Sequence, residues 1–113
     1  MNINEFLATE VMGWRRKKGH HDTNGPILHA HYIDPANKDF WLDAHDWNPT
    51  ENIEQAMMCL EQIDSHKGYV EIFRGKSGWP WSVRFRPNDE YVGDESLPMA
   101  ISLACARAAG WKE

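Results

Sequence analysis

The sequence predicts a layered α+β domain in which three amphipathic helices surround a small, mainly antiparallel sheet. Three observations lead to this prediction. The chain has 113 residues, of which 42% are hydrophobic and 26% charged. Residues 1–113 therefore have the size and composition of one globular domain. Apolar residues recur at helical spacing in three segments. Between these segments, apolar and polar residues alternate as in a strand with one buried face.

The first helix is predicted from Asn2 or Asn4 to about Met12, because an asparagine side chain can cap the first free N–H groups. Gly13 is placed to end this helix, and Trp14 can fold back on its last turn. Its apolar side consists of Ile3, Phe6, Leu7 and Val11.

A loop and then a hairpin are predicted after the first helix. Four consecutive basic residues at 15–18 precede a polar stretch with glycine and proline, a composition typical of a loop. Residues 27–33 alternate weakly between flanking prolines, which indicates a strand. Residues 40–42 are its predicted hairpin partner.

Residues 48–63 carry the most complete local signal in the chain. Asn48 can cap a helix, Pro49 suits its first position, and Glu51 lies three residues beyond the cap. Gly68 can end the helix in a left-handed conformation. The apolar stripe consists of Ile53, Ala56, Met57, Leu60 and Ile63. We expect this helix to cover the strands that follow it.

A second strand pair is predicted at 69–74 and 79–86, joined by a turn at 75–78. Pro80 has no N–H for a ladder, so we expect this end of the strand at a sheet edge. Alternation gives the later strand a buried face and a wetter face. The first comprises Trp79, Trp81, Val83 and Phe85, and the second comprises Ser82, Arg84 and Arg86.

The last helix is predicted to begin at Asp94, Glu95 or Ser96 and to end at Gly110, with Trp111 on its last turn. Small residues dominate its apolar stripe, and they let a helix approach a sheet or another helix closely. The stripe consists of Leu97, Ala100, Ile101, Ala104, Cys105 and Ala108. The predicted order is therefore helix, strand pair, helix, strand pair, helix.

Three short segments occur together in this chain. They are Leu7-Ala8-Thr9-Glu10-Val11-Met12-Gly13-Trp14, Trp47-Asn48-Pro49-Thr50 and Ala100-Ile101-Ser102-Leu103-Ala104-Cys105-Ala106-Arg107-Ala108-Ala109-Gly110. In this order they resemble the phage ABA-sandwich family of small proteins encoded by phages and prophages. The resemblance implies an α-β-α sandwich and offers no catalytic motif to carry over. The histidine-rich stretch at 20–31 is not part of the family pattern, so the resemblance implies nothing about it.

Charge and cysteine usage limit the possible classes of protein. A net charge of −5 argues against binding nucleic acid directly through phosphate contacts. Cys59 and Cys105 lie on predicted helices, where we expect free core thiols of a reducing cytoplasm. Neither a signal peptide nor a run of ~20 apolar residues is present. We therefore expect a cytoplasmic protein without a membrane partner, in the host cytoplasm if a phage encodes it.

Five of the six histidines lie between residues 20 and 45. His29 and His31 are predicted on one strand face, and a metal could use them with nearby carboxylates such as Asp43. The spacing matches no zinc signature, so we expect no bound metal and no cofactor. The competing interpretation is a set of half-exposed histidines on a polar sheet face.

Arg84 and Arg86 share a predicted strand face beside aromatic residues. Guanidinium groups in this setting suit a phosphate or carboxylate ligand. Together with His29 and His31 they form the predicted ligand-binding set. The alternative is a solvated face with cross-strand glutamate–arginine pairs.

Six tryptophans are many for a domain of this size, and we expect at least one to be exposed. Trp79, Trp81 and Trp41 are the predicted partner-binding residues. A homodimer that covers the Trp79–Trp81 strand end is one expected assembly.

Three hypotheses of function follow. The first is a phage accessory protein that binds a host or phage protein, for example one of a host defence system. The second is a small-molecule binder, such as a sponge for a nucleotide signal, with the arginine and histidine site. The third is a metal-assisted hydrolase, for which the sequence shows no complete site. The serines also lack any paired-base motif, so an enzyme is the less favoured class.

Overall fold

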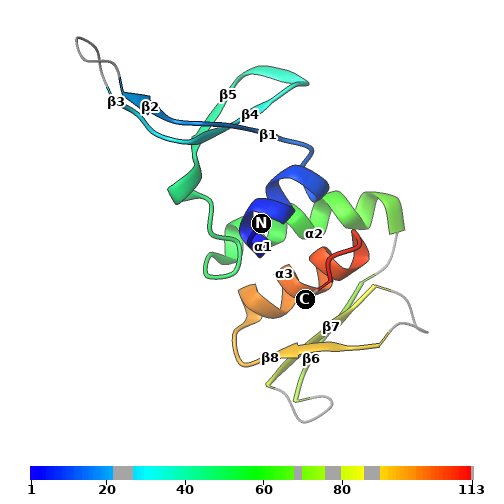
Figure 1. Ribbon diagram of the computed structural model, residues 1–113. Helices are drawn as coiled ribbons and strands as arrows, with labels where there is room; N and C mark the ends of the chain where they lie inside the picture. Colours follow the sequence, from blue (N-terminus) through cyan, green and yellow to red (C-terminus); the bar gives the residue numbers. More distant parts are fainter. Residues whose placement is uncertain (22–26, 68–69, 76–79, 86–89, 113) are drawn as a thin grey trace.

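The computed structural model describes residues 1–21, 27–67, 70–75, 80–85 and 90–112, with the backbone alone at 20–21, 27–28 and 64–67. The molecule is elongated, with principal extents of 55 × 26 × 23 Å. Its helices lie against one small sheet at one end, and a second set of strands extends away at the other end (Figure 1).

The chain begins with α1 (Ile3–Phe6), which continues into the π-helical turn η1 (Leu7–Val11). The Asn2 side chain caps α1 by accepting the Glu5 N–H at 2.8 Å. Gly13 adopts a left-handed φ of 74°, and the Trp14 N–H donates to the Ala8 carbonyl at 2.9 Å. The predicted cap and stop of the first helix are therefore confirmed.

The loop predicted for residues 15–26 is wrong at 15–17 and 20–21, and residues 22–26 lie outside the described part of the chain. The segment at 15–21 forms β1 (Arg15–Lys17) and β2 (His20–His21), which pair antiparallel with β4 (His31–Asp34) and β3 (Ile27–Leu28). Both ladders keep one register, since Lys17 lies opposite His31 and His20 lies opposite Leu28. Together they make one long ribbon. The basic run does not prevent strand formation because β1 is an edge strand, where charged side chains stay in water.

The predicted hairpin is confirmed, with a longer second strand than expected. β5 (Asn37–Asp43) pairs antiparallel with β4, which gives a first sheet in the order β1-β4-β5. The short 3₁₀ turn η2 (Ala44–Asp46) follows β5. The Ala44 N–H donates to the Ala30 carbonyl at 2.8 Å and holds this turn against the ribbon.

The cap of the central helix differs from the prediction. α2 spans Ile53–Lys67, and Asn52 caps it by accepting the Gln55 N–H at 3.1 Å. Asn48 instead begins a separate turn, in which its carbonyl accepts the N–H groups of Glu51 and Asn52. The helix therefore starts four residues later than its local signal suggests.

The buried face of α2 is also rotated from the predicted stripe. It consists of Ala56, Cys59, Leu60 and Ile63. Ile53 and Met57 were expected in the stripe, but they are 42% and 37% exposed. The reason is that α2 packs mainly against α3 rather than on the strands that follow it.

The second sheet consists of β6 (Glu71–Arg74), β7 (Trp81–Arg84) and β8 (Val92–Asp94), in that order. The expected edge position of the Pro80 end is wrong, because β7 is the central strand. The Pro80 carbonyl accepts the Gly75 N–H at 2.8 Å and closes the β6–β7 hairpin. The sequence did not predict β8, which contributes only three residues.

The last helix, α3 (Leu97–Ala108), contacts most of the elements at the helical end of the molecule. Ser96 caps it, Gly110 takes a φ of 100°, and the Trp111 N–H donates back to Ala106 at 2.9 Å. One side of α3 packs on β7 and β8, and α2 packs against it as well (Figure 1). Its small residues permit this double contact.

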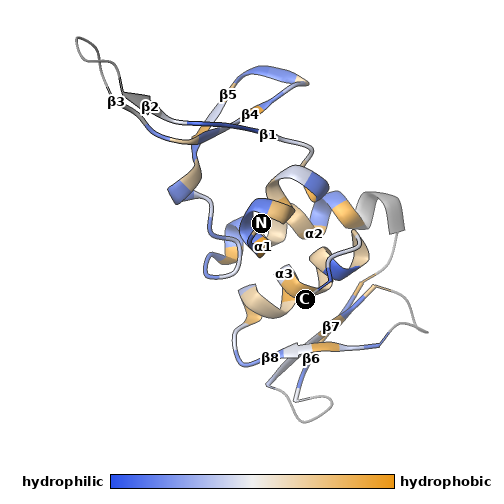
Figure 2. Cartoon of the chain, viewed as in Figure 1, coloured by the Kyte–Doolittle hydropathy of each residue, from blue (hydrophilic) through white to orange (hydrophobic). Residues whose placement is uncertain are grey.

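The core joins these elements through buried residues on η1, β4, α2, α3 and the second sheet, and on the segments that directly follow η1, η2 and β7. They are Leu7, Ala8, Val11, Trp14, Tyr32, Trp47, Ala56, Cys59, Leu60, Ile63, Val83, Phe85, Val92, Ala100, Ile101, Ala104, Cys105 and Ala106. Figure 2 shows hydrophobic residues concentrated in the helices, whereas the first sheet is mostly hydrophilic. None of the helices in the described part of the chain is long and apolar enough to cross a membrane.

The α+β class is confirmed by these elements. The described strands form two three-stranded sheets and a two-stranded ladder, however, rather than the single small sheet that was expected. Cys59 and Cys105 are free and fully buried, as predicted.

Candidate functional site

The first sheet has two chemically different faces. Tyr32 on β4 is 3% exposed and lies 6.1 Å from the Trp14 ring, so its face packs on the helical body. Neighbouring residues of a strand point to opposite faces. His31, Ile33 and Trp41 therefore share the other side with Arg15 and Lys17 of β1. We call these five residues the outer face of the first sheet.

The outer face consists of an aromatic centre with cations beside it. Arg15, Ile33 and Trp41 lie in one row across the three strands. Lys17, His31 and Asp43 form the next row, so one carboxylate lies beside the five outer-face residues. Trp41 is 53% exposed, and its ring lies 5.0 Å from the His31 ring. The contact brings a predicted ligand-binding residue and a predicted partner-binding residue together.

His29 does not lie on the strand face that was predicted for it. It lies in the connection between β3 and β4 and is exposed. Its carbonyl oxygen lies within hydrogen-bonding distance, 3.0 Å, of Nδ1 of His31. Its ring lies 5.9 Å from the His45 ring, on the side of a pocket. His29 and His31 therefore belong to different surfaces.

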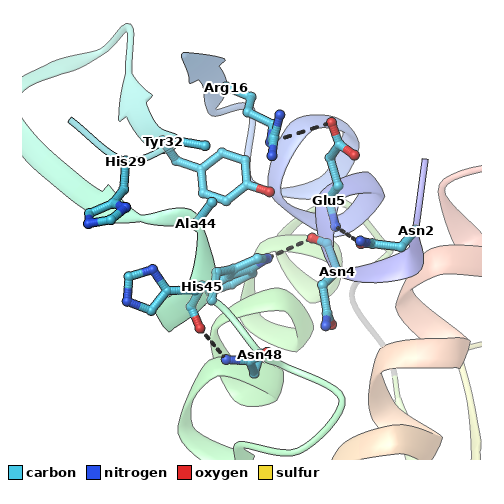
Figure 3. A pocket seen from close by; sticks show the side chains of 11 residues that line it. Asn2, Asn4, Glu5, Arg16, His29, Tyr32, Ala44, His45 and Asn48 are labelled. Atoms are coloured by element: carbon cyan, nitrogen blue, oxygen red, sulfur yellow. Dashed lines mark hydrogen bonds and ion pairs between the residues drawn. The ribbon is translucent and has the colours of Figure 1, made fainter. Parts of the chain in front are cut away.

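The pocket lies between the inner face of the first sheet, the N-terminal turn and η2 (Figure 3). Its volume is about 420 Å³. Its lining comes from the N-terminal turn, the ribbon and residues 44–48, and is mostly polar or aromatic: Asn2, Asn4, Glu5, Arg16, His29, Ala30, Tyr32, Ala44, His45, Trp47 and Asn48.

Electrostatic contacts hold this pocket together. Nε of Arg16 lies 3.7 Å from Oε1 of Glu5. Burial raises the pKa of the nearby Tyr32 hydroxyl, and the Glu5 carboxylate raises it further while Arg16 opposes the shift. The Trp47 indole N–H donates to the Asn4 carbonyl at 2.7 Å, so the indole is fixed in place.

A histidine between two carboxylates lies at the edge of this region. Nε2 of His45 is 3.9 Å from Asp43 and 3.5 Å from Asp46, and one ligand atom of each residue fits within 4.8 Å of the others. Three such groups can hold a cation, but exposed acidic groups also cluster without one. The expectation of no bound metal stays a prediction.

Arg84 lies on the second sheet, far from the histidines in the fold. Its guanidinium forms an ion pair with Glu71 across β6 and β7 and lies 4.3 Å from the centre of the Tyr91 ring. The Tyr91 hydroxyl donates to the same carboxylate at 3.2 Å. The cross-strand glutamate–arginine alternative is therefore observed. The other predicted arginine, Arg86, lies outside the described residues.

The three tryptophans that were predicted to bind a partner do not form one surface in the described part of the chain. Trp81 is half-buried, with the Arg74 guanidinium 5.4 Å from its ring centre, and Trp79 lies outside the described residues. The expectation of an exposed indole is confirmed at Trp41.

Sequence reasoning missed Glu5, Arg16, Tyr32 and His45 as residues that share a site. The pocket is assembled from three segments whose contacts are tertiary, and no local spacing connects them. A signal existed for Arg16 alone: if the basic run is taken as a strand, alternation places Arg15 and Lys17 on one face and Arg16 on the other.

Comparison with known proteins agrees with this architecture only at the family level. No curated protein and no solved structure matches the chain. Residues 5–106 match the family model described as the phage ABA sandwich domain, which covers most of the 113 residues. The chain therefore belongs to the phage ABA sandwich domain family.

Proposed function

We propose that this phage-family protein acts as an accessory protein that binds another protein through the outer face of the first sheet. The observation that carries the proposal is the half-exposed Trp41 ring, which His31 supports from one side at 5.0 Å. An indole that is anchored but exposed presents a large contact area at low entropic cost, and tryptophan is enriched among residues that dominate binding energy.

Charge defines the kind of partner. Residues 15–34 carry four basic and two acidic residues, whereas the rest of the chain carries eight and fifteen. The ribbon is thus the basic part of an acidic protein, and the side chains at 15–18 are exposed. Complementary charge speeds encounter and excludes wrong partners. The partner is therefore a host or phage protein with an acidic surface, and a host defence protein is one candidate.

The test compares tagged bait proteins in a bacterial lysate. Wild-type protein should enrich an acidic protein that Trp41→Thr does not retain, because threonine keeps the strand propensity but removes the ring. Arg15→Gln should weaken the retention and make it less sensitive to salt. Ile53→Ala is the matched control, since Ile53 is 42% exposed but lies on α2.

Two results would contradict the proposal. Loss of the captured species after nuclease treatment would identify nucleic acid as the occupant of the outer face. Equal capture by wild-type and Trp41→Thr baits would place the contact elsewhere on the chain.

The alternative of a small-molecule site at Arg84 has less support. Glu71 and Tyr91 already contact the Arg84 guanidinium, so an anionic ligand there would have to displace a carboxylate. Such an exchange of one anion for another offers little net gain in electrostatic energy.

A further inference from the structure

The pocket beneath the first sheet has the size of a small-molecule site. Its volume of about 420 Å³ lies within the ~300–1,000 Å³ typical of ligand pockets. The outer face has no part in its wall: Arg16 and Tyr32 point inward, while Arg15 and Trp41 belong to the opposite side of the sheet. A ligand here would be independent of the proposed protein contact.

Glu5 and Arg16 offer an acceptor and a donor side by side. Their closest atoms are 3.7 Å apart, which is longer than a good hydrogen bond, and the side chains are 27% and 41% exposed. The carboxylate oxygens and the guanidinium N–H groups therefore keep hydrogen-bonding capacity. A planar edge that carries a donor next to an acceptor would satisfy both groups at once.

Flat rings form much of the remaining wall. Figure 3 shows the Tyr32 hydroxyl beside Arg16 and Glu5, with His29 and His45 toward the other side of the Tyr32 ring. Trp47 is 1% exposed and its N–H donates to Asn4, so Trp47 supports the wall from behind and offers no free donor. The imidazole rings of His29 and His45 are exposed, and such rings are suitable stacking surfaces for bases.

The charges of the pocket favour a neutral ligand. The Glu5 carboxylate compensates the Arg16 guanidinium, and Asp43 and Asp46 lie beside His45. A phosphate in the pocket would therefore meet the Glu5 carboxylate together with the Arg16 guanidinium, which leaves little net electrostatic gain. A nucleobase combines a planar ring, a donor–acceptor edge and no net charge.

We propose that this pocket binds a neutral nucleobase-bearing small molecule, a nucleoside. The donor–acceptor edge of the base contacts Arg16 and Glu5, and its ring stacks on the exposed imidazoles of His29 and His45. The ligand lies between the N-terminal turn, the ribbon and η2.

Calorimetric titration of the purified full chain with adenosine, guanosine, cytidine and uridine tests this proposal. At least one nucleoside should bind, and its 5′-monophosphate should bind no more tightly. Arg16→Met and Glu5→Ala should each weaken binding about tenfold or more, because each removes a charge-assisted hydrogen bond. Arg15→Met is the matched control: it removes the neighbouring guanidinium on the opposite face and should leave the nucleoside affinity unchanged.

A second measurement does not depend on any variant. In the wild-type protein, nucleoside should shift the amide resonances of Ala30 and Ala44 and the indole N–H resonance of Trp47, which line the pocket. Absence of binding by all four nucleosides at millimolar concentration would overturn the proposal. Tighter binding of phosphate or of the monophosphates, or binding that Arg16→Met leaves unchanged, would overturn it as well.

Discussion

At the level of single residues, burial decides the chemistry of the two cysteines. Cys59 and Cys105 are both 0% exposed, and burial raises the pKa of the Cys59 thiol from 9.0 to about 12. The pKa of Cys105 is also raised, first by burial and then by its proximity to Cys59. These are packing residues of the α2–α3 contact, and their thiolate forms are disfavoured in the folded state.

The first prediction concerns alkaline pH. Because the folded pKa lies above the unfolded one, the stabilising contribution of each thiol is complete below pH 9 and is lost as the pH rises toward 12. The free energy of unfolding should fall by about 1.4 kcal/mol per pH unit for each thiol in this window. Urea titrations from about pH 8 to 10.5 measure this change in the free energy of unfolding. A constant free energy of unfolding across that range would contradict the assignment, and the Cys59→Ala variant should show a shallower slope.

The second prediction concerns the cap of α2. Asn52→Ala should lower the free energy of unfolding by about 1 kcal/mol, because it removes the acceptor of the Gln55 N–H. Denaturant titration provides the measurement. No loss of stability would mean that water replaces this cap without cost.

The Asn48 cap was predicted wrongly for a physical reason. Asn48-Pro49 and Asn52 both precede an apolar run, so local sequence allows a helix start at either asparagine. Tertiary contacts choose the later one: Gln55 accepts the Asn48 N–H at 2.6 Å and donates to the Asp46 carbonyl, which holds the earlier residues in a turn.

At the level of elements, the helices were predictable and the ribbon was not. Caps and left-handed glycines at Asn2, Gly13 and Gly110 act within a few residues, so the sequence contains them. β1 and β2 form because β4 and β3 provide partners across a long hairpin. A run of four basic residues carries no strand signal of its own, and pairing overrides its local preference.

The third prediction tests which face of α2 is buried. Leu60 is 5% exposed, so Leu60→Ala should lower the free energy of unfolding by about 2–5 kcal/mol through lost burial and a cavity. Met57→Ala, on the 37% exposed side, should change it by about half a kcal/mol or less. Equal losses in the two variants would show that the helix packs with another face.

At the level of the whole molecule, the helix order and both hairpins were predictable, but the division of the strands into two sheets was not. Which strands join one sheet depends on how α3 lies between the second sheet and α2, and no local pattern records that. The pocket could not be predicted from local patterns either, because its walls come from the N-terminal turn, the ribbon and residues 44–48.

The fourth prediction concerns self-association. The sequence suggested a homodimer through the Trp79–Trp81 strand end, but β7 is central and β6 lies at the edge of the second sheet. Ile72 and Phe73 on β6 are 38% and 40% exposed, and exposed apolar residues on an edge strand invite pairing. Light scattering should give twice the 13.1 kDa chain mass at micromolar concentration. Phe73→Lys should halve that mass, whereas a wild-type monomer throughout this range would exclude the dimer.

The central claim is that Trp41 on the outer face carries the contact with an acidic partner protein. Its most direct test is the dissociation constant of the captured, purified partner for wild-type protein, Trp41→Thr and Ile53→Ala, measured by calorimetry. We predict that Trp41→Thr weakens binding about tenfold or more, as for a residue that dominates an interface, while Ile53→Ala leaves it unchanged. Equal dissociation constants for wild-type protein and Trp41→Thr would contradict the claim.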